Sequence, residues 1–193
     1  MPRIPRSAIV APGETYHVIN RGSGRMKIFR DAEDYALYLQ LLGAGLKKYG
    51  IEMFHYVLMP NHFHLILRPV VSDLSACMHD VQLIYAKRFC SKYRRVGRVW
   101  QERFKCWLID TDRYLFACGN YIEMNPVRSY LVDAPGEWRY SSYLHYASGK
   151  KDRLLTTDPL YPSNGRTNKE RQREYRKYVP MTRSEFKKRA QKK

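Results

Sequence analysis

The sequence has no C-x-x-C pair and no long apolar run, and each absence argues against a class of protein. Its four cysteines lie 13, 16 and 12 residues apart, which argues against a zinc ribbon and against a dense disulfide framework. No apolar stretch approaches the roughly 20 residues that a membrane-spanning helix requires. The N-terminal residues also lack the apolar core of a secretory signal. We therefore expect a cytoplasmic protein whose thiols are free and mostly buried.

Acidic residues are scarce relative to basic ones. The chain has 35 Lys and Arg against 18 Asp and Glu, for a formal net charge of +17. Such an excess favours a polyanionic partner, and nucleic acid is the usual one, so we expect neither a membrane nor a small-molecule substrate. Aromatic residues make up 13% of the chain and include 16 tyrosines, which suits base stacking as well as core packing.

The expected strands and helices follow one another in an order that indicates the fold class. Runs rich in β-branched and aromatic residues predict strands at 14–20, 51–58, 62–68 and 103–110. Apolar residues at helical spacing predict helices at 31–50, from 72 or 73 to about 93, and from 111 or 112 to near Pro126. The order β-α-β-β-α-β-α begins as a ferredoxin-like split βαβ unit. We expect an α+β fold with an antiparallel sheet, helices on one face, a C-terminal helix and a basic tail.

Two histidines, His62 and His64, flank a single apolar residue on an expected strand. Alternate residues of a strand face the same side, so both imidazoles converge on one point, as a metal site requires. An H-x-H pattern is a weak signal by itself, and the alternative is a pair of ordinary histidines at a sheet edge. Tyr121 and Asn125 share a helix face if the third helix persists that far. They could then be a nucleophile and an oxygen ligand, although spacing alone favours a core tyrosine and a helix end.

Five separated segments resemble the HUH transposase family that has a single catalytic tyrosine. They occur in the family's order between about residues 13 and 147, and they read ETYHVINRG, YVLMPNHFHLIL, VWQERF, YIEMNPVRSYLV and WRYSSY. The YIxxNP block and the downstream WxxSS pattern are most similar to the REP-associated tyrosine transposases. One departure is that Pro12-Gly13-Glu14-Thr15-Tyr16 stands where some of these relatives have a Gly-Thr-Trp motif for reading a guide sequence.

The resemblance implies a metal-dependent endonuclease and strand transferase that acts on single-stranded DNA beside hairpins. It implies that His62 and His64 are metal ligands, that Asn125 is the third ligand, and that Tyr121 forms a 5′-phosphotyrosine. Mg²⁺ or Mn²⁺ is the expected cofactor because phosphate and Asn supply oxygen ligands, although two imidazoles also accept another divalent ion. The alternatives are a dimeric insertion-sequence transposase and a non-catalytic nucleic-acid-binding module of the same fold. We expect a monomer.

The expected division places an HUH catalytic domain at 1–150 and a basic C-terminal extension at 151–193. Residues 166–193 contain 12 Lys and Arg against three acids, and a short helix is expected around 169–178. We expect two groups of cations to contact DNA, the alternative being a solvated surface. The first group is Arg94, Arg95, Arg98, Arg103 and Lys105, and the second is Arg171, Arg173, Arg176 and Lys177.

Overall fold

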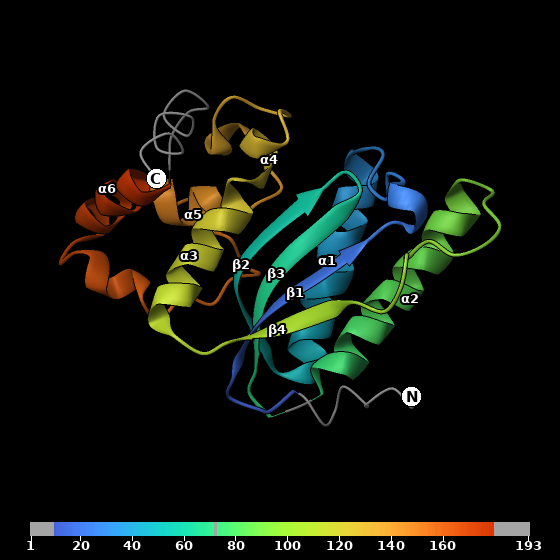
Figure 1. Cartoon of the computed structure of the whole chain (residues 1–193), viewed down its shortest axis with the longest axis horizontal. Helices are drawn as coiled ribbons and strands as arrows, with labels where there is room; N and C mark the ends of the chain where they lie inside the picture. The colour runs from blue at the N-terminus through green and yellow to red at the C-terminus, as the bar shows by residue number, and fades with distance from the viewer. Residues whose placement is uncertain (1–9, 72, 180–193) are drawn as a thin grey trace.

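The computed structural model describes residues 10–71 and 73–179, and its centre is a four-stranded sheet (Figure 1). The strands are β1 (Thr15–Arg21), β2 (Ile51–Met59), β3 (His62–Pro69) and β4 (Lys105–Ile109), in the spatial order β2-β3-β1-β4. All three neighbouring pairs are antiparallel. This is the expected split βαβ topology, in which β1 lies in the sheet between the two later strands β3 and β4. The last strand begins two residues later than its sequence pattern predicts.

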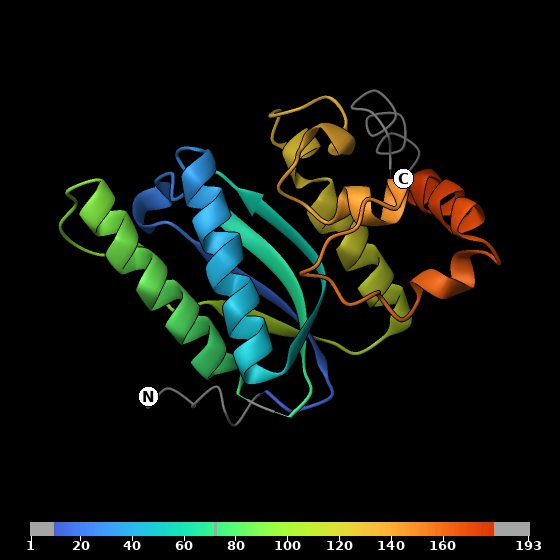
Figure 2. The same cartoon turned by 180° about the vertical axis from the view of Figure 1, so that it is seen from behind.

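Two long helices cover one face of the sheet, α1 (Ala32–Tyr49) and α2 (Leu74–Lys92) (Figure 2). Asp31 caps α1 by accepting a hydrogen bond from the Asp34 amide, and Gly50 ends it with a φ of 57°. Asp73 caps α2, while Ser72, the alternative cap, lies outside the described residues. Between these helices and the sheet, Tyr38, Phe63 and Tyr85 are each 0% exposed. This aromatic layer is the main core.

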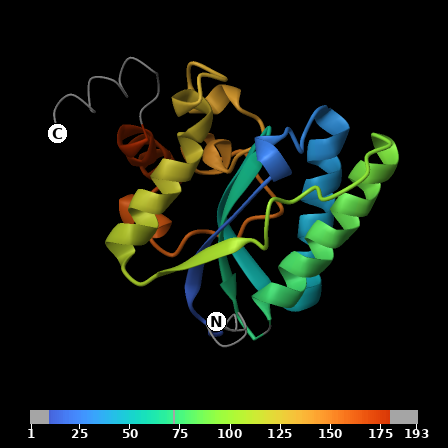
Figure 3. The same cartoon turned by 45° about the vertical axis from the view of Figure 1, so that its right-hand side comes forward.

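A third helix, α3 (Asp112–Glu123), packs on the opposite face of the sheet, so the sheet lies between two helical layers (Figure 3). The Thr111 side chain caps its start by accepting from the Tyr114 amide. Its buried residues Cys118 and Ile122 pack against Phe54 and Ile66 of the sheet. The helix ends at Glu123, and a separate turn, α4 (Asn125–Arg128), begins after the single intervening residue Met124. Asn125 therefore follows the tyrosine helix rather than continuing it.

The segment after α4 folds back onto α3 and the sheet. It contains η3 (Pro135–Glu137), α5 (Tyr143–Ser148), η4 (Tyr161–Asn164) and α6 (Asn168–Tyr178), and a further short turn, η2 (Ser23–Arg25), follows β1. The expected helix near 169–178 is confirmed as α6, which Thr167 and Glu170 start with a reciprocal capping box. The Tyr56 hydroxyl donates to Asp152 at 2.7 Å, which ties this segment to β2. The division at residue 150 stays a prediction.

A buried polar network joins β2, α3 and the C-terminal segment. His55 lies between two carboxylates, with Nδ1 3.1 Å from Glu123 and Nε2 2.8 Å from Asp158. The Ser142 and Tyr175 hydroxyls both donate to Glu123, at 2.6 and 2.7 Å. Burial opposes a charge on His55, but the hydrogen bonds to Asp158 and Glu123 outweigh it and raise its pKa to about 9. The network fixes the end of α3 against the sheet.

The cysteines agree with the sequence expectation of free, mostly buried thiols. All four thiols are free; Cys77 and Cys118 are buried, and Cys90 and Cys106 are half-buried. Burial raises the pKa of the Cys77 and Cys118 thiols to about 12, so both are protonated and inert near neutral pH. In residues 10–71 and 73–179, no helix combines the length and the apolar character needed to cross a bilayer.

Candidate active site

His62 and His64 project from the same face of β3, the face on which α3 lies. Their ring centroids are 5.1 Å apart, and the planes are nearly perpendicular. Tyr121 approaches from α3, and its ring centroid is 5.9 Å from that of His64. Strand alternation places the two imidazoles together, and helix packing brings the phenol to them. The structure thus unites three of the residues that the sequence singles out.

Asn61, in the β2–β3 turn, determines which nitrogen of His62 carries the proton. The Asn61 side-chain NH₂ donates to the Arg25 carbonyl at 3.2 Å, so its Oδ1 is the atom 2.6 Å from His62 Nδ1. An amide oxygen only accepts hydrogen bonds, and therefore Nδ1 of His62 must be the donor. The lone pair then resides on Nε2, which is left to bind a metal ion.

A third histidine, His17 of β1, belongs to the site and was missed in the sequence. Its Nε2 lies 2.9 Å from His64 Nδ1, and the two rings stack with centroids 5.1 Å apart. When His64 Nδ1 donates to His17, Nε2 of His64 also keeps its lone pair. The signal that could have revealed His17 is the expected topology, because β1 neighbours β3 and its alternate residues share the histidine face.

The three histidines are neutral near pH 7. Burial lowers the pKa of His17 to about 4, and burial together with the nearby Arg21 charge lowers that of His62 to about 4. The pKa of His64 falls to about 2, chiefly through burial and then through His62, His17 and Arg21. Neutral imidazoles are the form that binds metals. Arg21 is a second residue missed in the sequence; it lies directly opposite His62 in the β1–β3 register.

Tyr121 is accessible, as a nucleophile must be. Its side chain is 42% exposed, while the next residue, Ile122, is 0% exposed in the core beneath α3. The guanidinium carbon of Arg128, on α4, lies 4.6 Å from the centre of the Tyr121 ring. Tyr130 is 66% exposed beyond α4, with a φ of 58°. Tyr121 contacts a histidine of the pair, His64.

Asn125 lies one turn beyond Tyr121 and is 8% exposed. Its NH₂ donates to the Tyr121 and Ile122 carbonyls at 3.0 and 3.2 Å, so it satisfies carbonyls at the end of α3. This leaves its Oδ1 as the atom able to bind a metal ion. Residues 10–71 and 73–179 hold no cluster of three His, Cys, Asp or Glu side chains suited to a metal ion. The candidate ligand set is two imidazoles and one amide oxygen, which fits a divalent ion of intermediate hardness.

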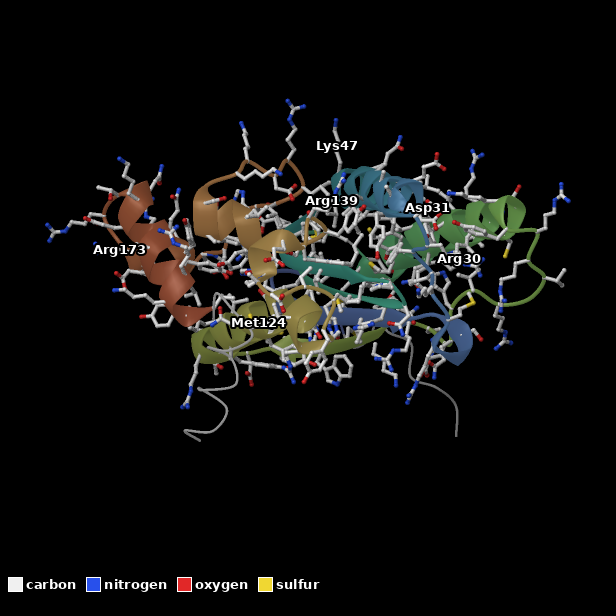
Figure 4. The ribbon with its side chains drawn as sticks, turned by 90° about the horizontal axis from the view of Figure 1, so that it is seen from above. Arg30, Asp31, Lys47, Met124, Arg139 and Arg173 are labelled. Atoms are coloured by element: carbon white, nitrogen blue, oxygen red, sulfur yellow. The ribbon has the colours of Figure 1, made fainter. Side chains whose placement is uncertain are left out.

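The two groups of candidate DNA-binding cations lie far apart (Figure 1). Four of the first group lie in the loop between α2 and β4, and Lys105 begins β4 and pairs with Glu102 at 3.1 Å. The second group is on α6, where Arg173 and Lys177 both pair with Glu174. Arg173 points outward at the end of the molecule opposite Asp31, to which Lys92 of α2 pairs (Figure 4). The structure therefore does not combine the two groups into one patch.

The remaining α6 cations bind local oxygens. Arg171 donates to the Gly165 carbonyl at 2.9 Å, and Arg176 donates to the Ala147 carbonyl. Both contacts hold η4, α5 and α6 together, which gives these two arginines a structural role beside any contact with DNA.

Comparison with known proteins identifies relatives of this chain. The family described as "Transposase IS200 like" matches residues 12–125, more than half of the chain. A curated Haemophilus influenzae protein, provisionally named a REP-associated tyrosine transposase, is 29% identical over 110 residues, which cover 49% of this chain and 60% of that protein. The matched part thus spans less than two thirds of that relative.

One of two similar solved structures shows the same fold. A REP-associated tyrosine transposase bound to a REP hairpin has a TM-score of 0.63 at 20% identity, covering 82% of this chain and 93% of that one. A Deinococcus radiodurans crystal structure, provisionally described as a transposase, is 17% identical with a TM-score of 0.43, covering 64% of this chain and 96% of that one. The first agrees with the expected fold.

Proposed function

Because the chain belongs to the IS200-like transposase family, we propose that it cleaves and rejoins single-stranded DNA beside hairpins in a metal-dependent reaction. The observation that carries the proposal is the position of Tyr121, whose ring lies 5.9 Å from His64 and on the same side of the sheet as His62. A phenol exposed next to two neutral, same-face imidazoles is what a phosphotyrosine mechanism with a bound ion requires.

In the proposed reaction the Tyr121 oxygen attacks the scissile phosphorus. A bond forms between that oxygen and phosphorus as the phenol gives up its proton, and the bond from phosphorus to the 3′ oxygen breaks. The leaving oxygen gains a proton and becomes a 3′-OH, so the step consumes no net proton. The DNA 5′ end stays on Tyr121 as a phosphotyrosine. Rejoining is the reverse step, with a 3′-OH as the attacking group. The energy of the phosphodiester is conserved in the covalent intermediate, so no further cofactor supplies it.

His62, His64 and Asn125 would hold the divalent ion, through two Nε2 atoms and one amide oxygen. The chemistry that such an ion, Mg²⁺ or Mn²⁺, supplies when bound is polarisation of the phosphoryl group. Asn61 orients His62 for this role, and His17 can orient His64, through the hydrogen bonds to their Nδ1 atoms. Arg128 lies against the nucleophile's ring and brings positive charge to the place where the phosphate would sit.

The partner that we propose is hairpin DNA with a single-stranded flank. The solved relative is bound to a REP hairpin, and the formal charge of +17 on this chain suits a polyanion. The α2–β4 loop lies along the end of β1, where the Gln101 amide donates to the Arg21 carbonyl at 2.9 Å. This backbone hydrogen bond places the cations of the α2–β4 loop near the end of β1 that lies opposite His62. We further propose that the protein acts in the cytoplasm, on the cell's own DNA.

Tyr121→Phe tests the nucleophile. The substrate is hairpin DNA from the flanks of the protein's own gene, in Mg²⁺ or Mn²⁺. The native chain should give a covalent protein–DNA band on a denaturing gel, whereas Tyr121→Phe should give none while still binding DNA. Tyr114→Phe and Tyr130→Phe are matched controls that remove one oxygen from other exposed tyrosines. A trapped adduct on Tyr114 or Tyr130, found by mass spectrometry, would overturn the assignment.

Tyr121 lies beside His64 of its own chain, and this favours a monomer that works in cis over a dimer that exchanges tyrosine helices. Mixing Tyr121→Phe chains with His62→Ala chains separates the two. Cis catalysis predicts that the mixture stays inactive, and sedimentation should give one monomeric species. Recovered cleavage in the mixture would support the dimeric alternative.

A further inference from the structure

An open groove begins at the proposed nucleophile and runs between α3 and the β4 edge of the sheet. Its volume is roughly 580 Å³, within the range of small-ligand sites. His64 and Tyr121 line one part of it, and Trp107 and Tyr114 line it from β4 and from the first turn of α3. Tyr114 and Tyr121 are seven residues apart on one helix, so the groove extends about 10 Å from the nucleophile.

The lining is aromatic and apolar, although the chain as a whole is strongly basic. Trp107 is 46% exposed and Tyr114 is 40% exposed, which is a large accessible surface for two aromatic rings. Ile19 and Cys118 also line the groove, and no Asp, Glu, Lys or Arg lines it along the described residues. Exposed apolar surface of this kind, bordered by charge, marks a binding site rather than a solvated face.

The position of Trp107 follows from the way α3 crosses the sheet. The buried residues of α3 pack on Phe54, Val57 and Ile66 of β2 and β3. Ile109, at the end of β4, is buried in the same cluster, so the helix covers that end of β4 and leaves Trp107 uncovered. On β4, Trp107 pairs with His17 across the β1–β4 register, and their ring centroids are 5.7 Å apart. The ring is held at one edge by the histidine and is open to the groove on the other.

We propose that this groove binds one unpaired nucleobase of the DNA strand, from a nucleotide flanking the scissile phosphate, between Trp107 and Tyr114. A base presents a flat π-face that stacks on such rings, while its phosphates remain outside near Arg21 and Lys105. The inference rests on the proposed function, because the position of Tyr121 defines which phosphate is scissile. Base stacking on these walls would hold the strand so that this phosphate meets Tyr121.

The test is abasic scanning combined with substitution of the walls, measured as binding in the absence of divalent ions. Hairpin DNA with single-stranded flanks is prepared with one abasic site at each flank position in turn. For the native chain, one position next to the cleavage point should weaken binding about tenfold, the size expected for one lost stacking contact. Trp107→Ala should weaken binding of intact DNA by a similar factor, and the abasic site should then have no further effect.

Matched variants keep the result interpretable. Leu108 adjoins Trp107 on β4, is also 46% exposed and points to the opposite face, so Leu108→Ala should keep the full abasic penalty. Trp107→Phe retains a ring and should retain most of the affinity. Tyr114→Ala removes the opposite wall of the groove, which belongs to α3, and should also abolish the abasic penalty. This second variant provides the test if Trp107→Ala does not fold.

Two outcomes would overturn the inference. An abasic penalty that persists in full in both Trp107→Ala and Tyr114→Ala would place the base elsewhere. A dimer in sedimentation that Trp107→Ala dissolves would make the groove a self-association surface. Neither outcome depends on cleavage, so the base-binding site and the proposed reaction are tested separately. If Trp107→Ala removes the abasic penalty but the native chain never cleaves DNA, the base-binding site stands and the proposed function fails.

Discussion

The two faces of the sheet differ although the same strands form both. Along β3, Phe63, Leu65 and Leu67 point to α1 and α2 and are each 0% exposed, while His62 and His64 alternate with them on the other side. Two long helices cover the first face over β1, β2 and β3, and leave Leu108 of β4 46% exposed. The second is covered by α3 over β2 and β3, so polar and aromatic groups remain accessible beside β1 and β4. One face stabilises the fold, and the other presents chemical groups.

Paired substitutions on β3 provide the largest test of this difference. His64→Ala should abolish cleavage and lower the free energy of unfolding by about 1–3 kcal/mol, since it leaves buried His17 without its hydrogen-bond partner. Phe63→Ala should lower the free energy of unfolding by about 3–5 kcal/mol because it leaves a cavity in the aromatic layer. Urea unfolding and a nicking assay measure the two effects. Full cleavage by both His62→Ala and His64→Ala in Mg²⁺ would refute the metal-site assignment.

A second prediction concerns the buried network that holds the C-terminal segment against the reactive face. Glu123 contacts His55, Ser142 and Tyr175, so Glu123→Ala leaves the imidazole with one carboxylate and two hydroxyls without their acceptor. Breaking a buried charged pair costs about 3–5 kcal/mol. Calorimetry should therefore show a large fall in melting temperature. Glu174→Ala, on exposed α6, is the control and should have little effect.

The same network makes stability depend on pH. The pKa of His55 is about 9 in the folded protein against an ordinary value of 6.5, because Asp158 and Glu123 face it, with Tyr146 stacked on its ring. A raised pKa means that the stabilisation is complete below pH 6.5 and is lost as the pH rises through 9. The free energy of unfolding should thus fall by on the order of 3 kcal/mol over that interval. His55→Gln should remove this dependence of the unfolding free energy on pH. If the variant and the native chain have the same dependence, His55 is not charged in the folded protein.

Much of the reactive face could be predicted from the sequence because it depends on local patterns. The period of two on a strand places His62 beside His64, and the family resemblance predicts the role of Tyr121. His17 could not be assigned from its own segment, since its role comes from strand pairing across 47 residues. The His55–Asp158 contact joins positions 103 residues apart, with nothing in either segment to indicate it. The position of Asn125 depended on where α3 ends, and helix ends are set by capping contacts that spacing does not reveal.

A smaller effect is expected from the turn that orients His62. Asn61→Ala removes the acceptor for Nδ1, so both tautomers become populated and ion affinity should fall about 10- to 100-fold. Asn61→Asp keeps an acceptor and should restore most of the affinity. Calorimetric titration of the metal-free chain with Mn²⁺ measures the affinity, and nitrogen NMR of His62 reports the tautomer directly. Equal affinity in Asn61→Ala and the native chain would mean that the turn does not orient the ligand.

The smallest expected effect distinguishes the two basic groups. Arg98 and Arg103 flank the loop residues whose backbone binds β1 beside the site, whereas Arg173 and Lys177 are paired with Glu174 at the far end of the molecule. Replacing either pair with Gln removes the same charge, so a general electrostatic attraction would weaken DNA binding equally in both variants. Direct phosphate contacts instead predict a loss in the loop variant, with the slope of log affinity against log salt reduced by about 1 for each contact removed. The α6 variant should keep nearly the native slope, because both of its cations pair with Glu174 and lie far from the histidines. A larger change of slope in the α6 variant would reverse the assignment and make the C-terminal helix, rather than the loop beside the histidines, the surface that follows the DNA backbone.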